Sequence, residues 1–133
     1  MLPRFLLDTH VVVRWVSESK KLSREQLRVM EEAERRGEPL ALSCISLLEI
    51  ALLAGEKLRL KRSVAEFFAE LEQNPLFTVL PLTYDVAAEV AALGPALRDP
   101  ADRAIVATAR VHRLRLLTSD QRIVDSQLVP VVE

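Results

Sequence analysis

Cysteine, glycine and aromatic residues are scarce in this chain of 133 residues. Its one cysteine, Cys44, excludes a disulfide framework within the chain and a thiolate metal site. The apolar neighbours of Cys44 favour a small buried side chain instead. Aromatic residues make up 5% of the chain, which argues against a surface that stacks the bases of single-stranded nucleic acid. Glycine occurs three times, and we see neither low-complexity segments nor a linker.

Neither sign of charge dominates the sequence. Eighteen basic and 19 acidic residues leave a formal net charge of −1, which argues against binding nucleic acid by overall charge but allows a local basic patch. No apolar run approaches the length of a transmembrane helix, and the first one is interrupted by Asp8 and Arg14. We therefore expect one domain over residues 1–133, with no membrane contact, in the cytoplasm.

Short apolar runs alternate along the chain with segments of helical periodicity. Such alternation is typical of an α/β protein in which helices cover both faces of a parallel sheet. The predicted strands are 5–7, 40–42, 77–80, 114–118 and 128–132. The predicted helices are 11–16, 23–37, 47–54, 63–71, 83–94 and 99–112.

Five acidic residues stand out by their position in this pattern. Asp8 ends the first predicted strand, and Asp120 follows the fourth. Asp99 and Asp102 open the last predicted helix, whereas Glu49 lies inside an apolar helix. Because ligands of open α/β sheets bind outside the carboxyl ends of the strands, these acids can face one edge of the sheet.

Each acid also has a purely structural explanation. Asp8 and Asp120 can serve as helix N-caps, and Asp99 before a proline is a strong cap signal. Glu49 is harder to explain, because no Lys or Arg stands at helical spacing from it and an unpaired buried charge is unfavourable. Glu49 therefore either lies at the edge of the buried face or is held there by a partner, and a metal ion would be such a partner.

A cluster of such carboxylates has a specific chemical meaning. Two of them about 4 Å apart repel by roughly 4 kcal/mol at an effective dielectric constant of about 20. A cation removes this repulsion, and an all-oxygen set of ligands selects hard ions such as Mg²⁺ or Mn²⁺. A bound ion of this kind can generate hydroxide and stabilise a phosphate under attack. The residues alone therefore predict a divalent-metal site for phosphoryl transfer or hydrolysis.

At four places the chain resembles the PIN-domain ribonucleases, and among them the VapC-type toxins of toxin–antitoxin pairs. The similarity follows the order and spacing of that family's motifs and spans nearly the whole chain. The matching segments are Leu6-Leu7-Asp8-Thr9-His10 with Trp15, Ser46-Leu47-Leu48-Glu49-Ile50-Ala51, Asp99-Pro100-Ala101-Asp102-Arg103 and Leu117-Thr118-Ser119-Asp120.

The resemblance implies a three-layer α/β/α fold with a short central parallel sheet. It further implies a Mg²⁺- or Mn²⁺-dependent endoribonuclease that is the toxin of a toxin–antitoxin pair, is silenced by a cognate VapB-type antitoxin and forms a homodimer. Arg103 is expected to help fix the nearby carboxylates. The residues assigned in this way are Asp8, Glu49, Asp102 and Asp120 as catalytic metal ligands, and Asp99, Thr118, Thr9 and Arg103 as accessory residues.

One basic segment, residues 56–62, alternates with apolar residues. We predict that Lys57, Arg59 and Lys61 contact the RNA backbone, because phosphate contacts dominate the affinity of proteins for nucleic acid. The alternative is a solvated turn between two helices.

Three alternatives to a metal-dependent nuclease stay open at this point. His10 and His112, the two histidines, could act as an acid and base pair without metal. A non-catalytic phosphoacceptor module similar to response-regulator receivers would also place acids at strand ends around Mg²⁺, although Asp8 stands alone where receivers have an acidic pair. A PIN-like domain without activity could serve only to bind a partner.

Overall fold

The computed structural model describes residues 1–133. Its centre is a five-stranded sheet with the order β3-β2-β1-β4-β5, in which all neighbouring strands are parallel. All five strands lie at their predicted positions, although the last is shorter than expected. Their bounds are β1 (Phe5–Leu7), β2 (Leu40–Ser43), β3 (Phe77–Leu80), β4 (Arg115–Leu117) and β5 (Val131–Val132).

Six of the helices were predicted from the sequence, and a short 3-10 helix and α7 were not. These two elements contain three and six residues, too few for an apolar repeat to be recognised. No helix is both long enough and apolar enough to span a membrane. The bounds are α1 (Thr9–Ser17), η1 (Ser19–Lys21), α2 (Arg24–Arg36), α3 (Cys44–Leu53), α4 (Val64–Gln73), α5 (Tyr84–Ala92), α6 (Pro100–His112) and α7 (Gln121–Ser126).

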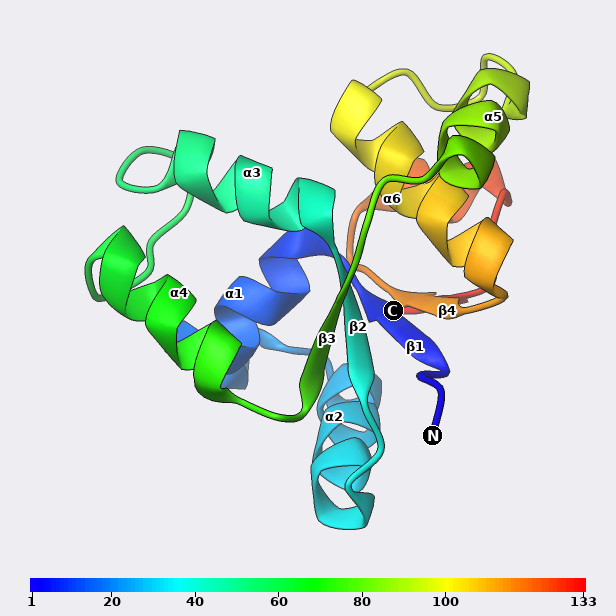
Figure 1. Ribbon diagram of the computed structural model, residues 1–133. Coiled ribbons are helices and arrows are strands. Elements are labelled where there is room, and N and C mark those ends of the chain that lie inside the picture. The colour runs from blue at the N-terminus through cyan, green and yellow to red at the C-terminus, as the bar shows by residue number, and fades with distance from the viewer.

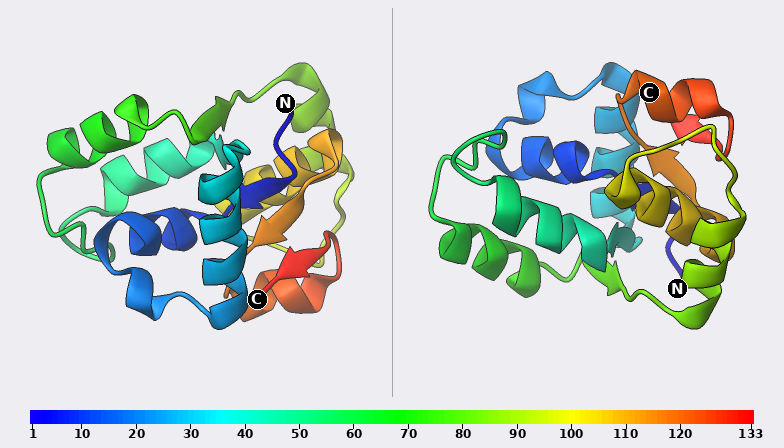
Figure 2. Two further views of the ribbon diagram at one scale, coloured as in Figure 1. Left: turned by 90° about the horizontal axis from the view of Figure 1, so that it is seen from below. Right: turned by 90° about the horizontal axis from the view of Figure 1, so that it is seen from above.

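Apolar side chains of the strands point alternately to the two faces of the sheet. They divide the core into two clusters, one on each face. Leu6 and Leu7 are both fully buried, but they belong to different clusters because successive side chains of a strand point to opposite faces. Leu7 packs with residues of α1, α2 and α4, whereas Leu6 packs with residues of α5, α6 and α7. Figures 1 and 2 show these groups of helices on the two sides of the sheet, which confirms the three-layer α/β/α fold.

Local capping signals set several of the helix ends. Ser23 and Gln26 form a reciprocal capping box at the start of α2, and Gly37 ends that helix in the left-handed conformation with φ 66°. At the start of α3, the Ser43 side chain caps the helix by accepting a hydrogen bond from the Ile45 amide at 3.1 Å. Cys44 is therefore the first residue of α3, where it is partly rather than fully buried.

The strand order places a topological switch point between β1 and β4. The chain runs outward from β1 through β2 to β3, and then returns through α5 and α6 to form β4 on the other side of β1. In open α/β sheets such a reversal opens a crevice at the carboxyl ends of the strands. Receivers have the order 2-1-3-4-5, so the strand order contradicts the receiver-like alternative.

Candidate active site

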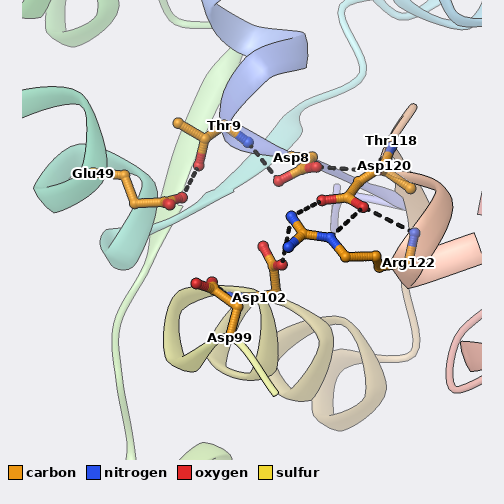
Figure 3. Close-up of polar contacts among 8 residues, drawn as sticks. All are labelled: Asp8, Thr9, Glu49, Asp99, Asp102, Thr118, Asp120 and Arg122. Carbon is orange, nitrogen blue, oxygen red and sulfur yellow. Dashed lines mark hydrogen bonds and ion pairs between the residues drawn. The ribbon is translucent and has the colours of Figure 1, made fainter. Parts of the chain in front are cut away.

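Acidic side chains gather at the switch point (Figure 3). Asp8 follows β1 directly, and Asp120 comes three residues after the end of β4. Asp102 lies in the first turn of α6, which packs against the same edge. In Figure 3 these three carboxylates point toward a common space, and Glu49 approaches it from α3.

Asp8 is buried and both of its carboxylate oxygens accept hydrogen bonds. The Thr9 amide donates to Oδ1 at 2.8 Å, and the Thr118 hydroxyl donates to Oδ2 at 2.7 Å. Burial raises the pKa of Asp8, and these two hydrogen bonds act against that rise. The carboxylate is therefore held in one orientation at the end of β1.

Glu49 is held by a hydroxyl of another helix and not by a basic residue. The Thr9 hydroxyl, on α1, donates to Glu49 Oε1 at 2.5 Å and also lies 2.9 Å from the hydroxyl of Ser46. Burial raises the pKa of Glu49, and the negative charges of Asp8 and Asp99 raise it further. The hydrogen bond from Thr9 partly offsets the cost of burying this carboxylate. No Lys, Arg or His forms an ion pair with it.

Asp102 is the least compensated acid of the group. Its backbone amide donates to Asp99 Oδ2 at 2.9 Å, so Asp99 caps α6 as predicted. The Asp102 side chain, in contrast, has a buried oxygen, Oδ2, without any hydrogen-bond partner. Burial raises the pKa of Asp102 to about 7, with further contributions from the charges of Asp99, Asp8 and Asp120.

Asp120 is paired with an arginine that the sequence analysis missed. Arg122 Nε lies 3.2 Å from Asp120 Oδ1, and its Nη2 lies 2.9 Å from Oδ2. The same Nη2 lies 3.8 Å from Asp102 Oδ2. These contacts lower the pKa of Asp120. The Asp-x-Arg spacing at the start of α7 is the signal that could have revealed this pair.

The chemistry of these donors fits a divalent cation. They are all oxygens, which hard ions such as Mg²⁺ prefer, and the unpartnered buried oxygen of Asp102 is the kind of group that a cation compensates. In the described side-chain conformations no three acids are yet close enough together to hold one ion. The residues that fit such an ion are Asp8, Glu49, Asp102 and Asp120.

Arg103 does not fix the carboxylates, and that expectation was wrong. Its guanidinium donates to the carbonyls of Val90, Gly94 and Leu97, at 2.6, 2.5 and 2.6 Å. All three acceptors belong to α5 or to the connection between α5 and α6. The physical reason is that the guanidinium has several donors in a fixed fork, and these three carbonyls lie around it and accept from them. Arg103 therefore positions the chain that leads into α6.

The predicted RNA-contacting residues lie in two different surroundings. Lys57 and Arg59 line a hollow of about 220 Å³ together with His10 and Arg14 of α1. His10 directly follows Thr9, which donates hydrogen bonds to Asp8 and Glu49. The hollow therefore begins beside the acidic site. Lys61 lies outside this lining and pairs with Glu18 at 3.1 Å.

The two histidines belong to different helices. His10 is the second residue of α1, close to Asp8, whereas His112 is the last residue of α6. Asp102 is in the first turn of that helix, so His112 lies roughly 15 Å from it along the helix axis. An acid and base pair of these histidines acting on one phosphate is therefore not supported.

Comparisons with known proteins agree with this geometry. The family model of the PIN domain matches residues 5–126. The chain is 37% identical over 120 residues to Ribonuclease VapC22 of Mycobacterium tuberculosis, covering 89% of this chain and 88% of that protein. Among solved structures, FitAcB of Neisseria gonorrhoeae is similar with TM-score 0.69 and 26% identity over 97% of this chain and 96% of that one. VapBC2 of Rickettsia felis, at 12% identity, shares the fold with TM-score 0.71 and 96% coverage of both chains.

Proposed function

Since the chain belongs to the PIN-domain family, and within it to the VapC type, we propose that it is a metal-dependent endoribonuclease acting as the toxin of a type II toxin–antitoxin pair. The observation that carries this proposal is the buried, unpartnered carboxylate oxygen of Asp102 among the other acids of the switch point. Helix capping alone does not explain this oxygen, because burying a carboxylate oxygen without a hydrogen bond is unfavourable. The similarity to Ribonuclease VapC22 supports RNA as the substrate class.

In this proposal Asp8, Glu49, Asp102 and Asp120 hold Mg²⁺ or Mn²⁺. Such an ion supplies a hydroxide-like water and neutralises charge on the phosphate under attack. The chain's own task is to orient the carboxylates. Two donors orient Asp8 and a hydroxyl orients Glu49, which limits the reorganisation that is needed when the phosphate arrives.

The basic hollow next to His10 offers a path for the RNA backbone. Lys57 and Arg59 are exposed there, and no ion pair in the structure involves either of them. Positive side chains without an internal partner are available for phosphate groups. Lys61 joins this path when its ion pair with Glu18 opens. Lys61 then exchanges one surface ion pair for another, with a phosphate, and such an exchange changes the free energy little.

We also propose a VapB-type antitoxin and a second copy of the chain as partners. Leu48 and Leu52 of α3 are 54% and 69% exposed, and Val79 of β3 is 45% exposed. Exposed apolar side chains on adjacent elements are typical of surfaces that bind another protein. Light scattering of the purified chain, alone and with its antitoxin, would determine both assemblies. We propose a cytoplasmic location as well, since an RNA substrate would be met there.

RNA cleavage by the purified protein with Mg²⁺ or Mn²⁺ tests the catalytic proposal. EDTA and the Asp102→Asn substitution should each abolish cleavage. Asp125→Asn is the matched control, because Asp125 is an exposed aspartate of α7 that is hydrogen-bonded only to Gln121. Cleavage that survives both EDTA and Asp102→Asn would contradict the metal site. A folded protein that binds Mn²⁺ but cleaves no RNA would favour the inactive binding module.

A further inference from the structure

The guanidinium of Arg122 bridges two carboxylates that come from different elements. It contacts both oxygens of Asp120, before α7, at 3.2 and 2.9 Å. Its Nη2 also lies 3.8 Å from Oδ2 of Asp102, in the first turn of α6. Figure 3 shows the arginine reaching between these two acids. One cation of the chain itself therefore lies against two of the four carboxylates that are proposed to hold the metal.

Arg122 is also the only Lys or Arg with an ion pair to any acid of the site. The remaining ion pairs of the structure connect surface residues elsewhere. The Asp102 oxygen nearest to Arg122 is the buried one without a hydrogen bond. At 3.8 Å the guanidinium compensates this charge by electrostatic attraction without forming a hydrogen bond.

The ion pairs of Arg122 can open without disturbing the fold. Its side chain is 74% exposed, so solvent screens its ion pairs and can replace them when they open. Arg103, in contrast, is tied to three backbone carbonyls. Arg122 can therefore leave the carboxylates by a rotation into solvent, with no change in the packing of the core.

A metal ion and this guanidinium need the same oxygens. An ion ligated by Asp120 and Asp102 would lie where Nη2 now approaches Oδ2 of both residues, and the two positive charges would repel. We infer that Arg122 is a built-in counter-ion, which occupies the acidic site of the metal-free protein and is displaced when a divalent cation binds. This inference rests on the proposed metal-dependent function and adds a residue that regulates access to that site.

Calorimetric titration with Mn²⁺ alone tests the competition without using activity. Arg122→Gln removes the charge and should tighten Mn²⁺ binding by about threefold to tenfold. Arg122→Lys keeps a charge but loses the two-pronged contact, so its affinity should lie between those of the parent and Arg122→Gln. Arg28→Gln is the matched control, because Arg28 is similarly exposed and pairs with Glu25 on α2. Its affinity should equal that of the parent.

The outcomes separate the inference from the function on which it rests. If Asp102→Asn weakens Mn²⁺ binding but Arg122→Gln binds as the parent does or more weakly, the inference is overturned and the metal site stands. If neither the parent nor any variant binds Mn²⁺, the metal site fails and the competition fails with it.

Side-chain NMR provides a second, direct readout. In ¹⁵N-labelled protein, saturating Mg²⁺ should move the Nε–H resonance of Arg122 toward the position of a solvated arginine. The resonance of Arg28 should stay in place. A resonance of Arg122 that is unchanged at a Mg²⁺ concentration shown by calorimetry to be saturating would overturn the displacement.

Discussion

The hydroxyl of Thr118 donates a hydrogen bond of 2.7 Å to Oδ2 of Asp8, which lies 110 residues earlier in the chain. The same hydroxyl accepts a hydrogen bond from the backbone amide of Asp120 at 3.1 Å. Thr118 is completely buried between the ends of β1 and β4. One hydroxyl thus orients one proposed metal ligand through its side chain and another through its backbone, directly at the switch point.

Thr118→Val should reduce RNA cleavage or metal affinity by about 10- to 100-fold, because residues that orient metal ligands have effects of this size. It should also lower the free energy of unfolding by roughly 1–3 kcal/mol, since a buried acceptor on Asp8 and the amide of Asp120 lose their partner. Thr108→Val is the control, because the Thr108 hydroxyl is buried but bonds the carbonyl of Ala104 in its own helix. Equal cleavage by the two variants would contradict the orienting role.

Asp102→Asn should change how the stability of the metal-free protein depends on pH. Folding raises the pKa of Asp102 from 3.8 to about 7, so the folded chain binds more protons than the unfolded chain between these values. Its stability therefore falls as the pH rises through this range, by up to roughly 4 kcal/mol. The asparagine variant lacks this loss, so its unfolding free energy relative to the parent should increase between about pH 4 and about pH 7 in EDTA.

Chemical denaturation of parent and variant in EDTA measures that difference. Asp125→Asn, on the exposed side of α7, should follow the parent at every pH. A difference between Asp102→Asn and the parent that is the same at all pH values would show that Asp102 titrates near its ordinary pKa.

Arg103→Met should destabilise the fold without removing the chemistry. It replaces three hydrogen bonds to the carbonyls of Val90, Gly94 and Leu97 and should lower the free energy of unfolding by about 2–4 kcal/mol. Arg28→Met, in an exposed pair on α2, should change it by less than about 1 kcal/mol. Below the melting temperature the folded Arg103→Met protein should still cleave RNA. Lost cleavage with unchanged stability would instead assign Arg103 to the carboxylates.

Lys57→Ala and Arg59→Ala should each weaken RNA binding with little effect on stability, because both side chains are exposed at the hollow near His10. If each contacts one phosphate of a single strand, each variant should lower the slope of log affinity against log salt by about 0.7. Binding by fluorescence anisotropy in the inactive Asp102→Asn background measures the slope. Arg24→Ala, at the start of α2, should leave it unchanged, and the same slope for all variants would exclude the basic hollow as the path.

Several features of this protein follow from local sequence alone. The apolar run 5–7 forms β1, and Asp99 with Pro100 starts α6 at the expected residue. Capping by Ser23 and termination at Gly37 also act within a few residues of the chain. Periodicity and capping are short-range effects, so they can be recognised without knowing which strands are neighbours. The position of the acids after strands and at the start of a helix was predictable for the same reason.

The contacts of the acids were decided only by the tertiary structure. Glu49 has no partner at helical spacing, yet the return of α3 beside α1 supplies the Thr9 hydroxyl. Arg103 follows Asp102 directly, but it turns to carbonyls of the preceding connection. Arg122 reaches Asp102 because the strand order places α7 beside α6 at the switch point. Such contacts depend on strand order and on the direction of each side chain, which pair residues far apart in the chain and leave no local pattern in the sequence.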